Sequence, residues 1–99
     1  MDPLPLSTIA GFAGAKIASG DPLQTITRIS TDSRTLQPGD LFVPIRGENF
    51  DGHNFIAQAV ERGASAALAA NDWTGSVPAN FALLRVADTL VGYQQIAAG

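Results

Sequence analysis

The sequence contains no cysteine and only one histidine, His53. Without cysteine the chain can form no disulfide bond, thiolate nucleophile or cysteine-ligated metal site. A single histidine cannot build a multi-histidine site either, so we predict no metal site. Basic residues are also few: six lysines and arginines stand against nine acidic residues, and the formal net charge is −3. Because the arginines are dispersed, no basic cluster is available to neutralise phosphates, and no nucleic-acid partner is expected.

Long hydrophobic runs are absent as well. No apolar stretch approaches the roughly 20 residues that a membrane-spanning helix needs. The first five residues, Met-Asp-Pro-Leu-Pro, lack the positive charge and the apolar stretch of a secretory signal. We therefore expect a cytoplasmic protein without a membrane partner. With 99 residues, 45% of them hydrophobic, the chain has the size and composition of one globular domain with a modest core.

The remaining residues alternate between helix-like and strand-like patterns. Ser7 is placed to cap a helix that ends at Gly14, and Asp88 is placed to cap the last helix. Between them, a strand–helix–strand step over residues 41–70 favours a parallel pair of strands. The predicted fold class is therefore a small α/β domain with a mixed β-sheet flanked by helices. Helices are predicted over residues 7–13, 53–62 and from 89 onwards, and strands over 16–18, 25–30, 41–45, 66–70 and 81–86.

The last predicted helix runs to the C-terminus at Ala98-Gly99 without a stop signal of its own. Such an ending is typical of a chain that was cut just after a domain boundary. We therefore expect residues 1–99 to form a single domain, and we expect that domain to be a piece of a longer protein.

Polar side chains gather after two predicted strands, in residues 31–34 and 47–53. In open α/β sheets, ligands bind at the carboxyl ends of the strands. Gly47 and Gly52 would let the backbone approach a ligand closely. The start of the helix near His53 would offer free N–H groups to a phosphate or a carboxylate. These two segments are therefore the candidate binding site.

Several of these side chains also have a purely structural explanation. Asp32 can form the turn that closes a strand, and Arg34 can pair on the surface with one of two aspartates, Asp32 or Asp40. Asp51 can cap the following helix, while His53 can pack its ring and bond a backbone carbonyl. At the level of sequence both kinds of contact stay open.

The sequence offers little for catalysis by this chain alone. Ser33, His53 and Asp51 are its only candidates for a Ser-His-Asp set, and no nucleophile elbow surrounds Ser33. The one lysine, Lys16, belongs to no Gly-x-x-x-x-Gly-Lys-Ser/Thr phosphate loop. We therefore predict no catalytic residue and no ATP site in this chain, and we expect the isolated chain to be inactive. A small hydrolase that uses Ser33 and His53 is the least favoured alternative.

Three stretches of sequence stand in order at a distinctive spacing. They are STDSR at 30–34, LQPGDLFV at 36–43 and GENFDGHNFI at 47–56, and they are followed by an alanine at 59 and Gly-Ala at 63–64. Together these stretches resemble the N-terminal domain of the Mur ligases, the bacterial ATP-dependent amide ligases of peptidoglycan precursor synthesis. Fainter similarity extends to both ends of the chain, including residues 86–90. Each stretch alone is a weak signal, whereas the combination is specific.

The resemblance implies a division of labour with other domains. In this family the N-terminal domain holds the UDP end of a UDP-MurNAc-peptide, and the central domain carries the phosphate loop. The C-terminal domain helps to bind ATP and the incoming amino compound. The implied partners of this chain are therefore the UDP-MurNAc-peptide substrate and the protein's own central and C-terminal domains. ATP and Mg²⁺ would be cofactors of the parent ligase, and this chain would hold no cofactor itself.

Two branches of the family share this kind of N-terminal domain. One branch adds lysine or diaminopimelate to UDP-MurNAc-dipeptide, and the other adds D-alanyl-D-alanine to UDP-MurNAc-tripeptide. The loop at 47–53 is more similar to the second branch, which is therefore the expected one. The first branch stays open as an alternative, as does a non-catalytic scaffold domain of the same fold without a nucleotide site.

Carried over residue by residue, the resemblance assigns Thr31 and Ser33 to contacts with the UDP part of the substrate. A hydroxyl and backbone N–H groups suit diphosphate oxygens. Arg34 would offset the charge of the diphosphate. One departure from the family pattern lies nearby, because Pro44 stands where small residues such as alanine are common. This departure puts the strand pairing at Pro44 in doubt, not the binding loops.

Glu48, Asn49 and Phe50 match the loop that closes over the nucleotide in the family. Asn49 can pair with a uracil edge, and Phe50 can offer an aromatic face. Since a carboxylate would repel a diphosphate, Glu48 is expected to make its contact through the backbone. Asp51 and His53 are expected to support the loop and to cap the helix that follows.

Overall fold

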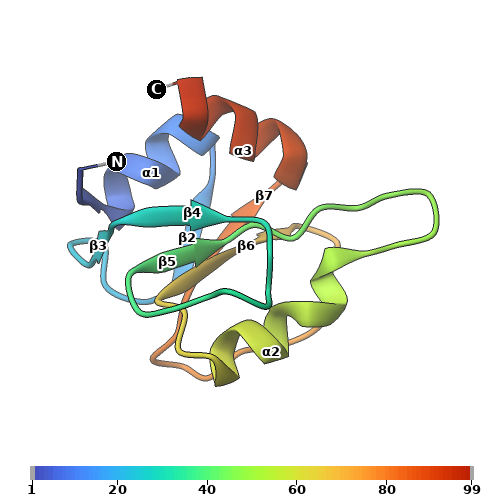
Figure 1. Ribbon diagram of the computed structural model, residues 1–99. Helices are drawn as coiled ribbons and strands as arrows, with labels where there is room; N and C mark the ends of the chain where they lie inside the picture. Colours follow the sequence, from blue (N-terminus) through green and yellow to red (C-terminus); the bar gives the residue numbers. More distant parts are fainter. Residues whose placement is uncertain (1, 99) are drawn as a thin grey trace.

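A five-stranded mixed β-sheet with helices on both faces forms the centre of the computed structural model, which describes residues 2–98 (Figure 1). The elements in chain order are β1 (Leu4–Pro5), α1 (Leu6–Ala13), β2 (Lys16–Ser19), β3 (Thr25–Ile26), β4 (Arg28–Ser30), β5 (Asp40–Phe42), the 3₁₀ helix η1 (Gly52–Phe55), α2 (Ile56–Glu61), β6 (Ala66–Ala70), β7 (Ala82–Val86) and α3 (Thr89–Ala98). The strand order is β2-β7-β6-β5-β4, in which β4 to β7 run parallel and β2 is an antiparallel edge strand. A second, two-stranded antiparallel sheet pairs β1 with β3. The predicted α/β class with a mixed sheet is therefore confirmed.

The two faces of the sheet carry two separate hydrophobic clusters. Helices α1 and α3 cover one face and α2 covers the other (Figure 1). Successive strand residues point to opposite faces, so Leu41 packs with the α1/α3 cluster while Phe42 packs with the α2 cluster. In the same way Leu68 of β6 belongs to the first cluster, and its neighbours Ala67 and Ala69 belong to the second. All five residues of β6 are buried, so this central strand is covered on both faces of the sheet.

Three predicted helix ends are confirmed by their local geometry. Gly14 adopts a left-handed conformation with φ 67° and ends α1, and Gly63 follows α2 with φ 86°. The carboxylate of Asp88 accepts the backbone N–H of Leu90 at 2.9 Å at the start of α3. The predicted terminus of this helix at Gly99 lies outside the described residues. The helices of residues 2–98 are short, and none is long and apolar enough to cross a membrane.

The predicted cap of the first helix is wrong. Helix α1 begins at Leu6, one residue before Ser7, and no side chain caps it. Its first backbone N–H groups are bonded instead by the turn before β3, since the N–H of Leu6 donates to the carbonyl of Gln24 at 2.7 Å and that of Ser7 donates to the carbonyl of Pro22 at 3.0 Å. A tertiary contact therefore replaces the local cap that the sequence pattern suggested.

The strand predicted over residues 25–30 is two strands in two sheets. Residues Thr25 and Ile26 pair with β1, whereas Arg28–Ser30 pair with β5. Between them, the N–H of Thr27 donates to the carbonyl of Gly39 at 2.9 Å, which carries the chain from the small sheet to the large one. The β-branched pattern of this segment is the same on both sides of that crossing, so periodicity alone did not reveal it.

The strand predicted over residues 41–45 is shorter than expected. Strand β5 ends at Phe42, and one further bond, from the N–H of Val43 to the carbonyl of Ser30 at 2.8 Å, continues its pairing with β4. The next residue, Pro44, is buried and has no N–H to donate, so the ladder stops there. Pro44 therefore marks the end of the strand and leaves its pairing with β4 intact.

The helix predicted over residues 53–62 is divided into a 3₁₀ turn and a short α-helix, η1 and α2. The tighter turn begins at Gly52, which lies against the backbone of the preceding chain. A Cβ atom placed on Gly52 would lie 2.7 Å from the nitrogen of Ile45 and 2.9 Å from the Cα of Pro44. The entry to the helix is therefore set by a close backbone approach.

This close approach predicts different costs for two glycine substitutions. We expect Gly52→Ala to lower the free energy of unfolding by about 1–3 kcal/mol, because the contacting atoms are backbone and must shift. Gly92→Ala in α3 is the matched control, since its Cβ would meet Leu68, Val86 and Ala13 at ordinary contact distances of 3.5–3.7 Å. The control should be neutral or stabilising by up to about 1 kcal/mol, because alanine favours a helix. Urea unfolding measures both, and equal stability of the two variants would contradict the expectation.

Candidate functional site

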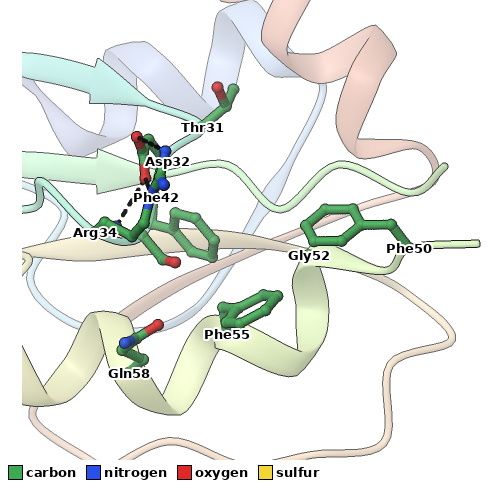
Figure 2. A pocket seen from close by; sticks show the side chains of 9 residues that line it. Thr31, Asp32, Arg34, Phe42, Phe50, Gly52, Phe55 and Gln58 are labelled. Carbon is green, nitrogen blue, oxygen red and sulfur yellow. Dashed lines mark hydrogen bonds and ion pairs between the residues drawn. The ribbon is translucent and has the colours of Figure 1, made fainter.

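A cavity of about 610 Å³ opens where strands β4 and β5 end (Figure 2). One side is formed by the turn that follows β4, and the other by the loop after β5 together with η1 and α2. Its lining consists of Thr31, Asp32, Ser33, Arg34, Phe42, Phe50, Gly52, Phe55 and Gln58. The two polar segments singled out in the sequence therefore contribute to one concavity, because parallel strands bring their carboxyl ends to the same edge of the sheet.

The turn after β4 is closed by local hydrogen bonds. The backbone N–H of Asp32 donates to the hydroxyl of Ser30 at 3.1 Å, and the carboxylate of Asp32 accepts the backbone N–H of Arg34 at 2.9 Å. The guanidinium of Arg34 reaches back to the same carboxylate, with Nε 3.1 Å from Oδ1 and Nη2 3.2 Å from Oδ2. The predicted turn and the predicted Asp32–Arg34 ion pair are both present (Figure 2).

The alternative ion pair of Arg34 with Asp40 does not form. Asp40 is buried at the start of β5, and its two oxygens accept bonds from Nε and Nη2 of Arg28 at 3.0 and 2.6 Å. The backbone N–H of Gln37 donates to the same carboxylate at 3.0 Å. A buried carboxylate requires such partners, and Asp40 is therefore a structural residue at the opposite end of β5 from the cavity.

The charges in the cavity lining cancel. Asp32 and Arg34 are its only ionisable side chains, and they are paired with each other. Hydrogen bonds from the side chain and backbone of Arg34 lower the pKa of Asp32 below its ordinary value of 3.8, and the same pair raises the pKa of Arg34. The Asp32 and Arg34 side chains are 41% and 81% exposed, and exposed pairs of this kind contribute little to stability because solvent screens them.

Three phenylalanines give the cavity an aromatic side (Figure 2). Phe42 is buried in the core, and its ring also contributes to the lining. The rings of Phe50 and Phe55 are stacked, with centroids 5.7 Å apart and planes inclined by 24°. They remain 56% and 37% exposed, which is unusual for side chains of this size. The site thus combines a polar turn with an accessible aromatic pair.

The loop that carries Phe50 is held at its base by ion pairs. Arg46 and Asp51 form an isolated bridge, and the side chain of Arg46 contacts Asp51 at 3.2 Å and Asp72 at 2.9 Å. Within the loop, the N–H of Gly47 donates to the carbonyl of Phe50 at 2.6 Å. These contacts tie the two ends of the loop to each other and to the chain that follows β6.

His53 connects this loop base to the sheet. It is 4% exposed, and its Nδ1 lies 2.7 Å from the carboxylate of Asp51, which also caps η1 by accepting the backbone N–H of His53 at 2.9 Å. The Nε2 of His53 accepts the backbone N–H of Ala70 at 3.0 Å, which places the ring proton on Nδ1. The structural role and the cap by Asp51 agree with the prediction, but the ring bonds a backbone N–H and not the expected carbonyl.

The predicted site residues fall into two groups. The cavity lining brings together Thr31, Ser33, Arg34 and Phe50. Glu48 and Asn49 are exposed at the far end of the loop, which projects from the body of the molecule, and they do not line the cavity (Figure 1).

Two lining residues were missed by sequence reasoning, Phe55 and Gln58. Phe55 falls within the helix predicted over residues 53–62, and as an apolar residue at helical spacing it is predicted to face the core. Because η1 is a 3₁₀ turn, Phe55 is instead turned toward the loop. The spacing of three residues between Phe55 and Gln58, which places side chains on one face of a helix, was the available signal.

The geometry does not support a hydrolase that uses Ser33 and His53. Both ring nitrogens of His53 are engaged, one by Asp51 and the other by the backbone of Ala70. A general base must reach the proton of its nucleophile, and this ring is committed to the loop base. Among residues 2–98, no group of three histidine, aspartate or glutamate side chains is arranged to hold a metal ion. What the cavity offers is binding by hydroxyls, N–H groups, a guanidinium and aromatic faces.

Comparisons with known proteins agree on one family. The family described as "Mur ligase family, catalytic domain" matches residues 25–90. The chain is 40% identical over 96 residues to the UDP-N-acetylmuramoyl-tripeptide--D-alanyl-D-alanine ligase of Bacillus subtilis (strain 168), covering 93% of this chain and 20% of that protein. It is 50% identical over 74 residues to the Synechocystis ligase of the same name, covering 75% and 16%. A UDP-N-acetylmuramoyl-L-alanyl-D-glutamate--2,6-diaminopimelate ligase of Bacillus licheniformis is 40% identical over 73 residues, covering 74% and 14%.

Solved structures give the same result. The crystal structure of MurF from Acinetobacter baumannii superimposes with a TM-score of 0.83 and 33% identity, covering 99% of this chain and 21% of that chain. MurF ligase from Thermotoga maritima in complex with ADP superimposes with a TM-score of 0.59 and 30% identity, covering 71% and 16%. The chain therefore spans about one fifth or less of the length of these relatives.

The ion pairs at the loop base predict that the base of the loop becomes less stable in acid. Burial disfavours ionisation of Asp51, but hydrogen bonds from the backbone and ring of His53 and from Arg46 outweigh it and lower the pKa of Asp51 below 3.8. A hydrogen bond from Arg46 likewise lowers the pKa of Asp72. A carboxylate with a lowered folded pKa stabilises the fold above its unfolded pKa, and this contribution is lost as the pH falls through the folded value.

We therefore expect the side-chain carboxyl signals of Asp51 and Asp72 to titrate with midpoints below 3.8. An NMR titration measures both midpoints, and in the Asp51→Asn variant only the Asp72 transition should remain. A midpoint above 3.8 in the unmodified chain would contradict the assignment of these bonds.

Proposed function

The chain belongs to the Mur ligase family, and from this premise we propose that it is the N-terminal domain of a ligase that joins D-alanyl-D-alanine to UDP-MurNAc-tripeptide. Its own task in that reaction is to bind the UDP part of the substrate. The observation that carries the proposal is the cavity at the ends of β4 and β5, which joins the polar turn at 31–34 to the aromatic pair Phe50 and Phe55. A nucleoside diphosphate is complementary to this cavity, because its anionic diphosphate suits the polar turn and its flat aromatic base suits the two rings.

The proposal gives each lining residue a chemical role. The hydroxyls of Thr31 and Ser33, with the backbone N–H groups of their turn, bind diphosphate oxygens, and Arg34 supplies positive charge. Phe50 and its stacked neighbour Phe55 offer aromatic faces to the uracil. Asp51 and His53 keep the base of the loop in place.

The loop tip contributes in a different way. Asn49 pairs with the uracil edge, and Glu48 acts through its backbone. Since neither residue lines the cavity in the structure, both contacts require the projecting loop to close over the nucleotide.

ATP and Mg²⁺ belong to the rest of the parent enzyme in this proposal. The sequence has no phosphate loop, and the described residues do not fit a metal site. A relative from Thermotoga maritima was solved with ADP, and the chain covers only 16% of that protein. The central and C-terminal domains are thus the proposed partners that perform the chemistry, the isolated chain is proposed to be inactive, and the cytoplasmic location expected from the sequence is part of the same proposal.

A second candidate is supported by the matches to diaminopimelate ligases. By name these relatives join 2,6-diaminopimelate to UDP-N-acetylmuramoyl-L-alanyl-D-glutamate, and they match this chain at similar identity, 44% and 40%. They cover 64% and 74% of it, however, whereas the D-alanyl-D-alanine ligase of Bacillus subtilis covers 93%. The wider match favours the tripeptide enzyme. A scaffold domain without a nucleotide site is the remaining alternative.

Binding of the nucleotide is tested on the chain itself by amide NMR. We expect UDP and UDP-MurNAc-tripeptide to shift signals in residues 31–34 and 47–53, because these segments border the cavity. Phe50→Ala should weaken UDP binding at least about fivefold if the ring stacks on the base. Phe12→Ala is the matched control, since Phe12 is also partly exposed but lies on α1 and does not line the cavity. Silence of both segments at millimolar UDP would refute the nucleotide site and leave the scaffold alternative.

Two chimaeric enzymes distinguish the branches. This chain replaces the matching segment of the Bacillus subtilis D-alanyl-D-alanine ligase in one, and of the Bacillus licheniformis diaminopimelate ligase in the other. We expect the first chimaera to retain amide-bond formation and the second to lose most of it, because a domain's contacts with its neighbours follow its own branch. The reverse result would establish the second candidate instead.

A further inference from the structure

The cavity contains an ion pair at the place where the proposed diphosphate would bind. Asp32 and Arg34 both line the cavity, and the guanidinium donates to both carboxylate oxygens. Arg34 is the only cationic side chain of the lining. Because it is paired with Asp32, its positive charge is already compensated before a ligand arrives. An anion that enters must either share Arg34 with Asp32 or replace Asp32 as its partner.

We infer that Asp32 is an internal competitor for Arg34, and that a bound diphosphate takes the guanidinium from the Asp32 carboxylate. The inference rests on the proposed function and adds a rule of specificity to it. Every anion that binds here must displace the Asp32 carboxylate from Arg34 and must then lie near its negative charge. Both effects lower the affinity of the anion. A ligand that binds only through phosphates is therefore disfavoured, whereas a nucleotide recovers the loss through its base.

The exposure of the two side chains makes the exchange feasible. The Arg34 side chain is 81% exposed, and among residues 2–98 it donates hydrogen bonds to Asp32 alone, so no other hydrogen bond holds it in this position. Exposed ion pairs contribute little, whereas bidentate bonds between a guanidinium and a phosphate are charge-assisted and strong. The diphosphate is therefore the better partner for Arg34.

The carboxylate, in contrast, is fixed. Its Oδ1 also accepts the backbone N–H of Arg34, and the backbone of Asp32 is bonded to the hydroxyl of Ser30. When the guanidinium leaves, Asp32 therefore stays at the mouth of the cavity as a negative charge. Because the carboxylate stays in place, it competes with every anion that enters. Its bond to the backbone also means that a substitution which keeps an acceptor at this position can remove the charge without opening the turn.

Asp32→Asn is that variant, because the asparagine carbonyl can still accept the N–H of Arg34. Asp21→Asn is a matched control: Asp21 also accepts a backbone N–H two residues ahead, that of Leu23 at 2.9 Å, it does not line the cavity, and its substitution changes the net charge equally. We expect D32N to bind UDP and inorganic pyrophosphate about three- to tenfold more tightly than the unmodified chain at low salt. Uridine binding should not change, and D21N should match the unmodified chain.

Three further measurements test the exchange itself. In an Arg34→Gln background the gain from D32N should be clearly smaller than in the unmodified background, because D32N then removes only the repulsion between Asp32 and the anion and releases no guanidinium. In the unmodified chain, the Nε–H signal of Arg34 should move on addition of UDP, which requires no variant to fold. The gain should also shrink as salt rises, since exposed charges are screened.

The outcomes separate this inference from the proposed function. If the unmodified chain binds UDP but D32N binds it equally or more weakly, or the Arg34 signal stays in place, the competition is refuted and the nucleotide site stands. An equal gain in D21N would refute it too, because net charge alone would then explain the effect. If neither the unmodified chain nor D32N shows any response to UDP, the inference and the nucleotide site are both refuted.

Discussion

The parallel pairing of β4 with β5 determines where this domain can bind a ligand. The register places Ser30 opposite Phe42, and one last bond joins Val43 to the carbonyl of Ser30. Beyond that point the two chains separate, because Pro44 has no N–H with which to continue the ladder. The chain after β4 turns back at Asp32, while the chain after β5 leads out into the projecting loop. The cavity is the space that this separation leaves, so its position follows from backbone hydrogen bonding before any side chain is considered.

The small side chains of β6 determine what covers the other side of the cavity. Ala67 and Ala69 point toward α2, and both are completely buried. Larger residues there would push α2 away from the sheet, since interiors are packed without free space. With α2 close to the sheet, Phe55 and Gln58 face the turn at 31–34 across the cavity. A strand that contributes no residue to the site thus sets the width of the site.

Features that depend on neighbouring residues could be predicted from the sequence, and those that depend on distant ones could not. The turn at Asp32 and the cap at Asp88 were predicted because one carboxylate and a backbone N–H two residues ahead suffice to form them. The cap at Ser7 failed because the carbonyls that bond the start of α1 come from the segment before β3.

The same distinction applies to the strands and to the site. The division of residues 25–30 depended on Gly39, and the role of Phe55 depended on the 3₁₀ turn that Gly52 and the backbone of Ile45 impose. The assignment of Glu48 and Asn49 came from resemblance alone, and a resemblance carries residue positions without the conformation of the loop that holds them.

The base of the loop contributes to the stability of the fold, whereas its tip is exposed and available for contacts with a ligand. Its base is bonded through Asp51, His53 and Arg46 to the backbone of Ala70 and to Asp72, so the position of the base is part of the fold. Its tip, with Glu48 and Asn49, is exposed and contributes nothing to the core. A change at the tip therefore alters contacts with a ligand at little cost in stability, whereas a change at the base alters both. Because Phe50 lies between the two, with its ring stacked on Phe55, it is the residue through which a movement of the tip would be transmitted to the cavity.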